Sequence, residues 1–417
     1  MRYISTSSDR TCSRLLASTT IAVSVLLCVA CGGGVDGSDQ WVASWHAAQQ
    51  NYNEVALAPP PALNVSNETV RQIVHTSVGG NSLRLRLSNL FGTSSVTFNA
   101  VHVAKSAGNG AIVAGTDQTV TFGSETSVTV AAGTEIWSDR IALPIPTQSD
   151  LAVSLFIGDS AAVATSHTEA LQTNYEAAGN QTASASLSGS STFESYYWLS
   201  GVDVARIGGT KVMVAFGDSI TDGYHSTTDA NHRWPNFLDD RVQAAGSPTG
   251  PMSVVNSGIG GNRWLHDITG PNGIGRFARD VTDISGVTHV AILLGINDIG
   301  YGIYAPQQTV TGAQIIGAIQ IAVAQAKAKG LKVYVGTLLP FKGAVYYSDA
   351  GETSRQAVNA YIRSASGIDG VIDFDKALQD PSDPASLLPV YDSGDHLHPD
   401  DAGYQVMGGL VNLNSLN

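Results

Sequence analysis

The chain has 417 residues, of which 43% are hydrophobic and 14% are charged. This length and apolar content suffice for two to three domains with hydrophobic cores, which excludes a disordered or fibrous protein. The 35 acidic residues outnumber the 22 basic ones, for a net charge of -13. Because such a surface repels phosphate backbones and anionic headgroups, we expect no nucleic-acid partner and a neutral substrate.

The first 31 residues have the layout of a secretory signal. Arginines at positions 2, 10 and 14 precede an apolar stretch from Leu15 to Ala30, which ends in small residues. The sequence therefore predicts a signal peptide at 1–31 and an exported protein. A transmembrane anchor is the alternative, but serines and threonines dilute a stretch that is short for a span of ~20 residues.

All three cysteines, Cys12, Cys28 and Cys31, lie in this leader, so the rest of the chain has no disulfide and no thiol nucleophile. The segment after Cys31, at 32–40, is rich in Gly, Ser and Asp and is predicted to be a linker. This arrangement resembles the lipobox of bacterial lipoproteins. The resemblance implies a lipidated Cys31 that attaches the protein to the membrane, in the periplasm or at the outer membrane. Ordinary signal cleavage with free secretion is the alternative.

Between Trp41 and about Ile207, short alternating runs are separated by Gly, Asn, Ser and Asp. The clearest run is Leu83–Leu87, in which three leucines alternate with two arginines. Such alternation, with a turn about every ten residues, is typical of an all-β sandwich or jelly roll. We predict a β-rich domain at 41–207, with further strands at 70–77, 96–104, 119–122, 128–130, 141–145 and 151–157.

From Lys211 onward, short apolar runs alternate with helical stretches. This pattern indicates a parallel sheet with helices on both faces, and ligands bind such sheets at the carboxyl ends of their strands. We therefore predict an α/β domain at 211–417. Its expected strands are 212–216, 254–255, 290–294, 333–336 and 371–372, and its expected helices are 234–245, 274–284, 310–329 and 354–364.

Polar or glycine-rich segments follow the predicted strands. Gly217–Ser219 ends the first strand, Asn256–Asn262 the second and Gly295–Asp298 the third, while Asp395–His398 lies near the C-terminus. A serine nucleophile needs a base for its proton, a carboxylate to orient that base and donors for an oxyanion. The four segments together contain all of these groups.

These residues resemble the SGNH family of GDSL-type esterases and lipases, whose four blocks contribute Ser, Gly, Asn and His in this order. The resemblance covers the chain from Lys211 to the C-terminus, and the region 41–207 is similar to the β-rich region that precedes this domain in some bacterial members. It implies an SGNH-type, flavodoxin-like parallel sheet. It also implies a carboxylic ester hydrolase that works through an acyl-enzyme, with no cofactor and no metal.

The resemblance assigns a role to each matching position. Ser219 is the nucleophile, His398 is the base, and Asp395, three residues earlier, is the partner of that base. The oxyanion hole consists of the N–H of Ser219, the N–H of Gly261 and the side-chain amide of Asn297.

Several of these assignments have alternatives. Gly260 could replace Gly261, because two consecutive glycines leave the register of that block open. His396 could be the base and Asp392 its partner, although only the assigned pair has the family spacing. A metal site is a further alternative, but the chain has no second His/Cys cluster of ligand spacing. Its ligands would be His396, His398, Asp392, Asp395 and Asp400.

A second Gly-Asp-Ser segment, at 158–160, lies in the β-rich region. No helical stretch follows Ser160. Two alanines come directly after it, whereas Ser219 is followed by Ile-Thr-Asp-Gly. Since Ser and Asp are common in turns, the tripeptide alone means little, and we predict Ser219 rather than Ser160 as the nucleophile. The absence of a Gly-x-Ser-x-Gly motif around Ser219 argues against the α/β-hydrolase family.

The sequence thus predicts an exported serine ester hydrolase that acts on small-molecule or polysaccharide esters. Short-chain carboxylic and acetyl esters are favoured, with polysaccharide O-acetyl esters as the close alternative and longer lipids as a third. An alternative of another class is a surface carbohydrate-binding protein with a vestigial SGNH domain. The intact set of predicted site residues argues against it. Five other histidines are expected to be structural, namely His46, His75, His102, His167 and His289.

Overall fold

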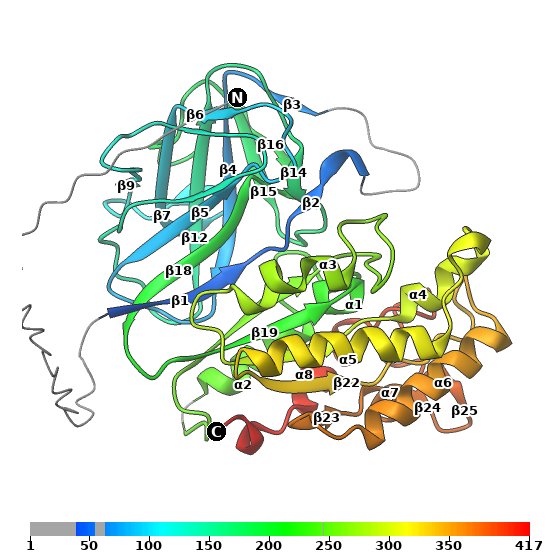
Figure 1. The fold of residues 1–417 in the computed structure, drawn as a ribbon. Coiled ribbons are helices and arrows are strands. Elements are labelled where there is room, and N and C mark those ends of the chain that lie inside the picture. The colour runs from blue at the N-terminus through cyan, green and yellow to red at the C-terminus, as the bar shows by residue number, and fades with distance from the viewer. Residues whose placement is uncertain (1–38, 55–62, 245) are drawn as a thin grey trace, which may run out of the picture. The chain divides into compact units, whose positions relative to one another are not determined.

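A computed structural model describes residues 39–54, 63–244 and 246–417. The predicted signal peptide, Cys31 and most of the predicted linker lie outside these residues. Gly37–Asn417 form one compact unit, in which a β-rich region precedes an α/β region (Figure 1). The boundary predicted between them at about residue 210 stays a prediction. Within the described residues, no helix combines the length and apolar character that a membrane crossing requires.

Five parallel strands form the sheet of the α/β region, in the order β20-β19-β21-β22-β23. In chain order this is 2-1-3-4-5, the flavodoxin-like arrangement, so the predicted fold class is confirmed. Four of the strands are almost entirely buried because helices flank the sheet, and the edge strand β23 is partly exposed (Figure 1). Their bounds are β19 Lys211–Gly217, β20 Met252–Gly258, β21 His289–Leu293, β22 Lys332–Gly336 and β23 Gly370–Ile372.

All four predicted helical segments of this region form, and one of them starts early. The helix expected at 354 begins at Asp349, because the Ser348 side chain accepts a hydrogen bond from the Gly351 N–H and caps the helix there. The helices are α1 Ser219–Asp222, α2 Trp234–Gln243, α3 Gly273–Phe277, α4 Ile296–Gly300, α5 Gly312–Ala328, α6 Asp349–Ser364, α7 Phe374–Leu378 and α8 Asp401–Leu410. The segment predicted at 274–284 forms as α3 followed by a π-helical turn (Ala278–Thr282), whereas α1, α4, α7 and α8 are not predicted from the sequence. Short 3-10 turns and the hairpin of β24 (Gln379–Asp380) and β25 (Asp383–Leu387) complete the region.

The region before β19 is β-rich with antiparallel sheets, as predicted. Its two larger sheets have the orders β1-β18-β5-β11 and β16-β15-β4-β12-β7-β8, with β9 paired to β7. The strands are β1 Asp39–His46, β2 Gln50–Asn51, β3 Asn64–Val65, β4 Glu68–Thr76, β5 Leu83–Ser88, β6 Val96–Phe98, β7 Ala100–Gly108, β8 Ala111–Ile112, β9 Gln118–Thr119, β10 Val128–Val130, β11 Glu135–Trp137, β12 Ser149–Ile157, β13 Ala161–Ala162, β14 Thr165–His167, β15 Asn174–Ala178, β16 Ser191–Phe193, β17 Tyr196–Tyr197 and β18 Leu199–Ile207.

One predicted strand, at 141–145, does not form. This segment makes only isolated bridges, from Ile141 to Leu83 and from Ile145 to Gly80. Pro144 and Pro146 explain the difference, because a proline has no N–H to donate to a continuous ladder.

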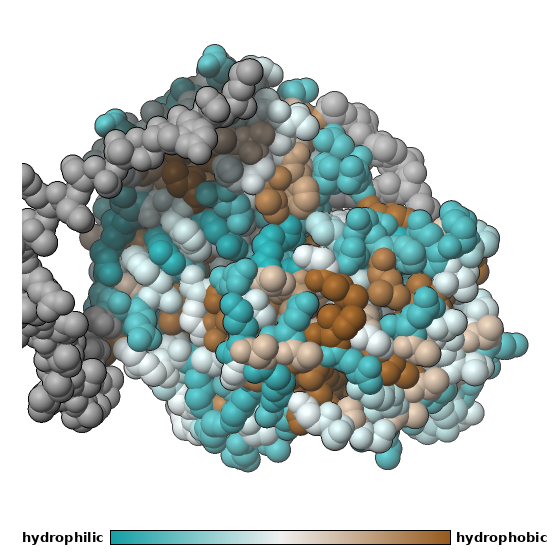
Figure 2. Space-filling model, viewed as in Figure 1, coloured by the Kyte–Doolittle hydropathy of each residue, from teal (hydrophilic) through white to brown (hydrophobic). Residues whose placement is uncertain are grey.

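The two regions are joined by buried hydrogen bonds as well as by apolar contacts. The Ser77 hydroxyl donates to Asp239 Oδ1 over 2.6 Å and accepts from the Val254 N–H over 2.9 Å. Arg279 Nη2 donates to the Gln49 carbonyl over 3.0 Å. On the face that Figure 2 shows, polar and apolar residues are interspersed, with apolar ones gathered over the α/β region. The β-rich region therefore packs directly against the elements that carry the site described next.

Candidate active site

Ser219 lies at the carboxyl end of β19, where the apolar strand turns sharply into α1. The turn is tight: a Cβ on Gly217 would lie 2.4 Å from the Leu293 carbonyl oxygen. Asp218 caps α1, since its side chain accepts from the Ile220 N–H over 3.1 Å. As the first residue of α1, Ser219 has an N–H without an intrahelical acceptor, and its side chain is almost wholly buried.

The structure brings Ser219, His398 and Asp395 together, although 179 residues separate the serine from the histidine. Ser219 Oγ lies 2.7 Å from His398 Nε2, and His398 Nδ1 lies 2.6 Å from Asp395 Oδ2. The tautomer that satisfies both contacts has its proton on Nδ1, so the serine hydroxyl donates to Nε2. The imidazole is thus oriented to remove a proton from the serine.

Asp395 is held in place by its own loop. Its Oδ1 accepts from the Leu397 N–H over 2.9 Å and from the His398 N–H over 2.8 Å. Burial alone would raise the pKa of Asp395, but the hydrogen bond and charge of His398 outweigh it and hold this pKa below its usual value. The carboxylate therefore stays ionised and can stabilise an imidazolium at His398.

The alternative residues of this segment form a separate pair. His396 Nδ1 lies 2.6 Å from Asp392 Oδ2, and the His396 ring is exposed. Ser160 is also exposed, in the loop between β12 and β13, with no helix after it. Neither His396 nor Ser160 shares in the contacts between Ser219 and His398.

The loops after β20 and β21 bring the predicted oxyanion donors to the same edge of the sheet. Asn297 Nδ2 donates to the Asn262 carbonyl over 3.1 Å, and Asn297 Oδ1 accepts from the Tyr346 hydroxyl over 3.1 Å. These bonds fix the amide and leave one Nδ2 proton for a ligand. The Gly260 N–H already donates to Asp222 Oδ2 over 3.1 Å. By contrast, the Gly261 N–H has no acceptor in the described part of the chain, so Gly261 is the available donor.

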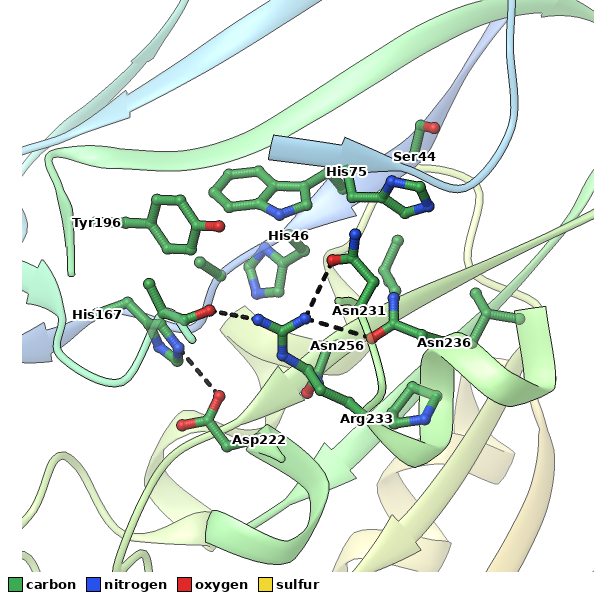
Figure 3. A pocket seen from close by; sticks show the side chains of 16 residues that line it. Ser44, His46, His75, His167, Tyr196, Asp222, Asn231, Arg233, Asn236 and Asn256 are labelled. Atoms are coloured by element: carbon green, nitrogen blue, oxygen red, sulfur yellow. Dashed lines mark hydrogen bonds and ion pairs between the residues drawn. The ribbon is translucent and has the colours of Figure 1, made fainter. Parts of the chain in front are cut away.

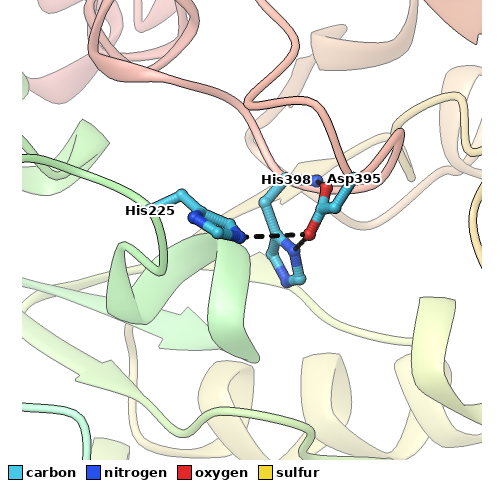
Figure 4. A group of neighbouring side chains, drawn as sticks. All are labelled: His225, Asp395 and His398. Carbon is cyan, nitrogen blue, oxygen red and sulfur yellow. Dashed lines mark hydrogen bonds and ion pairs between the residues drawn. The ribbon is translucent and has the colours of Figure 1, made fainter.

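Sequence reasoning missed His225, which follows α1 and faces the same carboxylate. Figure 4 shows His225 and His398 both directed at Asp395, and His225 Nε2 lies 3.4 Å from Asp395 Oδ2. His225 has a left-handed backbone with φ of 69°, which is uncommon for a residue other than glycine. Among the described residues these three side chains are the group that could hold a metal ion, with ligand atoms within 4.8 Å of one another. Two of them already bond to each other, so they fit a hydrogen-bonded relay better than a metal site.

The β-rich region also reaches the site, through the last residue of β14. His167 Nε2 lies 3.0 Å from Asp222 Oδ1, at the end of α1. This contact borders a small cavity of about 60 Å³ between the two regions, which side chains of both line (Figure 3). Ser219 is not among its lining residues. The cavity is therefore separate from the Ser219 hydroxyl and too small for an ester substrate.

Residues 215–406 match the model of the GDSL-like lipase/acylhydrolase family. The chain carries a GDSL-like lipase/acylhydrolase domain. This domain contains each of the five site residues that the sequence predicts.

Solved structures of GDSL and related hydrolases cover about half of the chain. A GDSL-like lipase from Bacteroides thetaiotaomicron is 22% identical, with a TM-score of 0.36, over 48% of this chain and 84% of its own. An aryl esterase from M. smegmatis is 18% identical, with a TM-score of 0.38, over 48% of this chain and 95% of its own. An acetylxylan esterase from Geobacillus stearothermophilus, solved as a catalytic mutant, is 20% identical, with a TM-score of 0.38, over 49% of this chain and 92% of its own. No curated protein matches the chain.

Proposed function

We propose that this protein is a serine carboxylic ester hydrolase. The observation that carries the proposal is the hydrogen-bonded relay from Ser219 through His398 to Asp395, with distances of 2.7 and 2.6 Å. A buried serine whose hydroxyl donates to a carboxylate-oriented imidazole is the arrangement that serine esterases need. The GDSL-like lipase/acylhydrolase domain supports the same chemistry.

The proposed reaction has two halves. His398 Nε2 takes the proton as Ser219 Oγ attacks the ester carbonyl, and the oxyanion is bound by the N–H groups of Ser219 and Gly261 and the Asn297 amide. The intermediate then expels the alcohol, which receives the proton from His398, and leaves an acyl group on Ser219. In the second half His398 activates a water that releases the acid and restores the serine.

We propose neutral short-chain or acetyl esters as the substrates, with polysaccharide O-acetyl esters as the close variant. The net charge of -13 supports a neutral substrate, because a negative field repels anionic ones. The test is to measure kcat/KM of the purified protein on p-nitrophenyl esters from acetate to laurate and on acetylated xylan, with Ser219→Ala as the blank. We expect the shortest acyl groups to react fastest. Absence of hydrolysis on every ester would overturn the function, and a maximum at laurate would overturn the short-chain preference.

We further propose that the protein is exported and membrane-attached through a lipidated Cys31. The arginines, apolar stretch and glycine-rich segment of the first 40 residues support this. Fractionation of cells that produce the wild type and Cys31→Ser is the test. The wild type is expected in the membrane fraction, and an equal distribution of the two proteins would contradict lipidation.

A further inference from the structure

A chain of hydrogen bonds runs from the β-rich region to the loop that carries the oxyanion donor. His167 Nδ1 lies 3.0 Å from the Ala48 carbonyl oxygen, and His167 Nε2 lies 3.0 Å from Asp222 Oδ1. The other oxygen of Asp222 accepts from the Gly260 N–H over 3.1 Å. Figure 3 shows His167 and Asp222 facing each other across the junction of the two regions. Asp222 thus links a histidine of β14 to the residue next to Gly261.

The contacts of His167 favour the positively charged form of its ring. Both ring nitrogens face oxygen acceptors, and only the imidazolium can donate to both. Burial opposes the charged form, but the charge of Asp222 and its hydrogen bond outweigh burial and raise the pKa of His167 above its usual value. His167 and Asp222 are only 5% and 3% exposed. Loss of the imidazolium charge would leave the buried carboxylate of Asp222 without a compensating positive charge.

The loop has no room to shift toward its other neighbours. A Cβ on Gly260 would lie 2.1 Å from Glu169 Oε2, and a Cβ on Gly261 would lie 2.9 Å from Thr269 Oγ1. Neither oxygen has a hydrogen-bond partner among the described residues, so both lie close to the loop without bonding to it. The residues on either side have other anchors, since the Ile259 N–H donates to the Gly217 carbonyl and Asn262 Nδ2 donates to the Pro271 carbonyl. Among the described residues, the bond to Asp222 is the polar contact of the Gly260–Gly261 pair itself.

We propose that His167 is a positioning residue for the proposed esterase, and that it acts through Asp222 to place the Gly260–Gly261 loop so that the Gly261 N–H meets the oxyanion. This inference rests on the proposed function. It gives the β-rich region a role in the reaction: His167 touches no reacting atom, yet it holds the acceptor that orients a donor peptide. A donor displaced from its position loses much of its effect, because one oxyanion contact changes turnover by about 10² to 10³.

The test compares His167→Leu, which removes both donors, with His167→Gln, which keeps an amide donor. His102→Leu is the matched control, because His102 Nδ1 pairs with Asp117 Oδ2 over 2.9 Å in the same β-rich region. For each protein kcat and KM are measured on p-nitrophenyl acetate, together with the inhibition constant of phenylboronic acid, which forms a tetrahedral adduct with a serine hydroxyl. Hydrogen exchange of the peptide covering 256–262 reports on the loop without reference to activity.

We expect His167→Leu to lower kcat by about 10- to 100-fold, with KM changed by less than about threefold and boronate affinity reduced in step with kcat. His167→Gln should recover part of this loss, and the control should behave as the wild type. Exchange at 256–262 should rise in His167→Leu. The proposal is overturned if a folded His167→Leu keeps wild-type kcat and boronate affinity. If that variant does not fold, wild-type kcat and boronate affinity in a folded Asp222→Ala, which removes the acceptor of the Gly260 N–H, overturn it.

Failure of the proposed function would look different. A wild type that hydrolyses no ester, or Ser219→Ala as active as the wild type, would refute the esterase. The exchange measurement would still show whether His167 positions the loop, and unchanged exchange in a folded His167→Leu counts against the positioning.

Discussion

The two Gly-Asp-Ser segments of this chain contain the same three residues, but they lie in different regions and have different surroundings. Ser160 follows the antiparallel strand β12, is exposed and leads into the two-residue strand β13. Ser219 follows the parallel strand β19, is buried and begins a helix. The parallel sheet brings the loops after β20 and β21 to the end of β19, and Ser219 meets His398 there. The same tripeptide can therefore serve as a nucleophile segment or as an ordinary turn, depending on the fold around it.

The most direct way to break this comparison is to remove each hydroxyl in turn. Ser219→Ala should lower kcat on p-nitrophenyl acetate by about 10⁴-fold or more, because no acyl-enzyme can form. Ser160→Ala should retain wild-type kcat. Steady-state rates of both purified variants provide the measurement. Wild-type activity in Ser219→Ala together with its loss in Ser160→Ala would reverse the assignment of the nucleophile.

The two Asp-His pairs near the C-terminus allow a second comparison between a site residue and its counterpart outside the site. The expected change in kcat is smaller than for Ser219→Ala. Asp395→Asn should lower kcat by about 10² to 10⁴-fold, because the neutral amide no longer stabilises the imidazolium of His398. Asp392→Asn changes the separate pair with the exposed His396 ring and should leave kcat within about threefold of the wild type. Equal losses in the two variants would show that the two pairs do not differ in function.

The motif spacing was sufficient to predict that Ser219, Asp395 and His398 meet. Each lies in a segment at the end of the sheet where parallel strands bring loops together, and a separation of three residues lets Asp395 reach the histidine ring. The apolar runs likewise predicted the five strands of the α/β region. These features are local in sequence, or follow from the rule that parallel strand ends lie together.

The features that could not be predicted depend on contacts between distant segments. The choice between Gly260 and Gly261 depends on which N–H Asp222 accepts, and Asp222 is 38 residues away from that loop. His225 faces Asp395 because of its left-handed backbone, which no nearby residue signals. His167 is expected to be structural from its sequence context, but its partner Asp222 lies in the other region, so their contact could not be predicted. The strand wrongly predicted at 141–145 is different, since its two prolines were visible in the sequence.

A third prediction concerns the oxyanion donors. Asn297→Ala should lower kcat by about 10² to 10³-fold with a smaller change in KM, because the amide acts mainly on the charge that develops in the transition state. Asn256→Ala is the control: Asn256 Nδ2 donates to the Thr221 carbonyl, so this variant tests a structural asparagine at an adjacent strand end. Measurement of kcat and KM separates the two roles. If Asn297→Ala raises KM and leaves kcat unchanged, Asn297 does not belong to the oxyanion hole.

The smallest expected effect concerns stability at the junction of the two regions. Burial and the nearby charge of Asp222 raise the pKa of Glu169 to about 7, against a smaller opposing effect of His167. The folded protein therefore binds a proton there that the unfolded chain releases near its usual pKa of about 4.3, so through this group stability falls as pH rises between about 4.3 and 7. Below that range the group has no effect on stability, and above it the loss is complete.

Glu169→Gln is neutral at every pH and should remove this part of the pH dependence. Relative to the wild type, its free energy of unfolding in urea should be similar near pH 4 and higher by on the order of 1–3 kcal/mol at pH 8. Other buried carboxyls with raised pKa values, such as Asp218 and Asp298, remain in both proteins, so the difference isolates Glu169. Glu194→Gln, at an exposed position of the same region, is the control. A constant difference between Glu169→Gln and the wild type from pH 4 to 8 would mean that folding does not raise the pKa of Glu169.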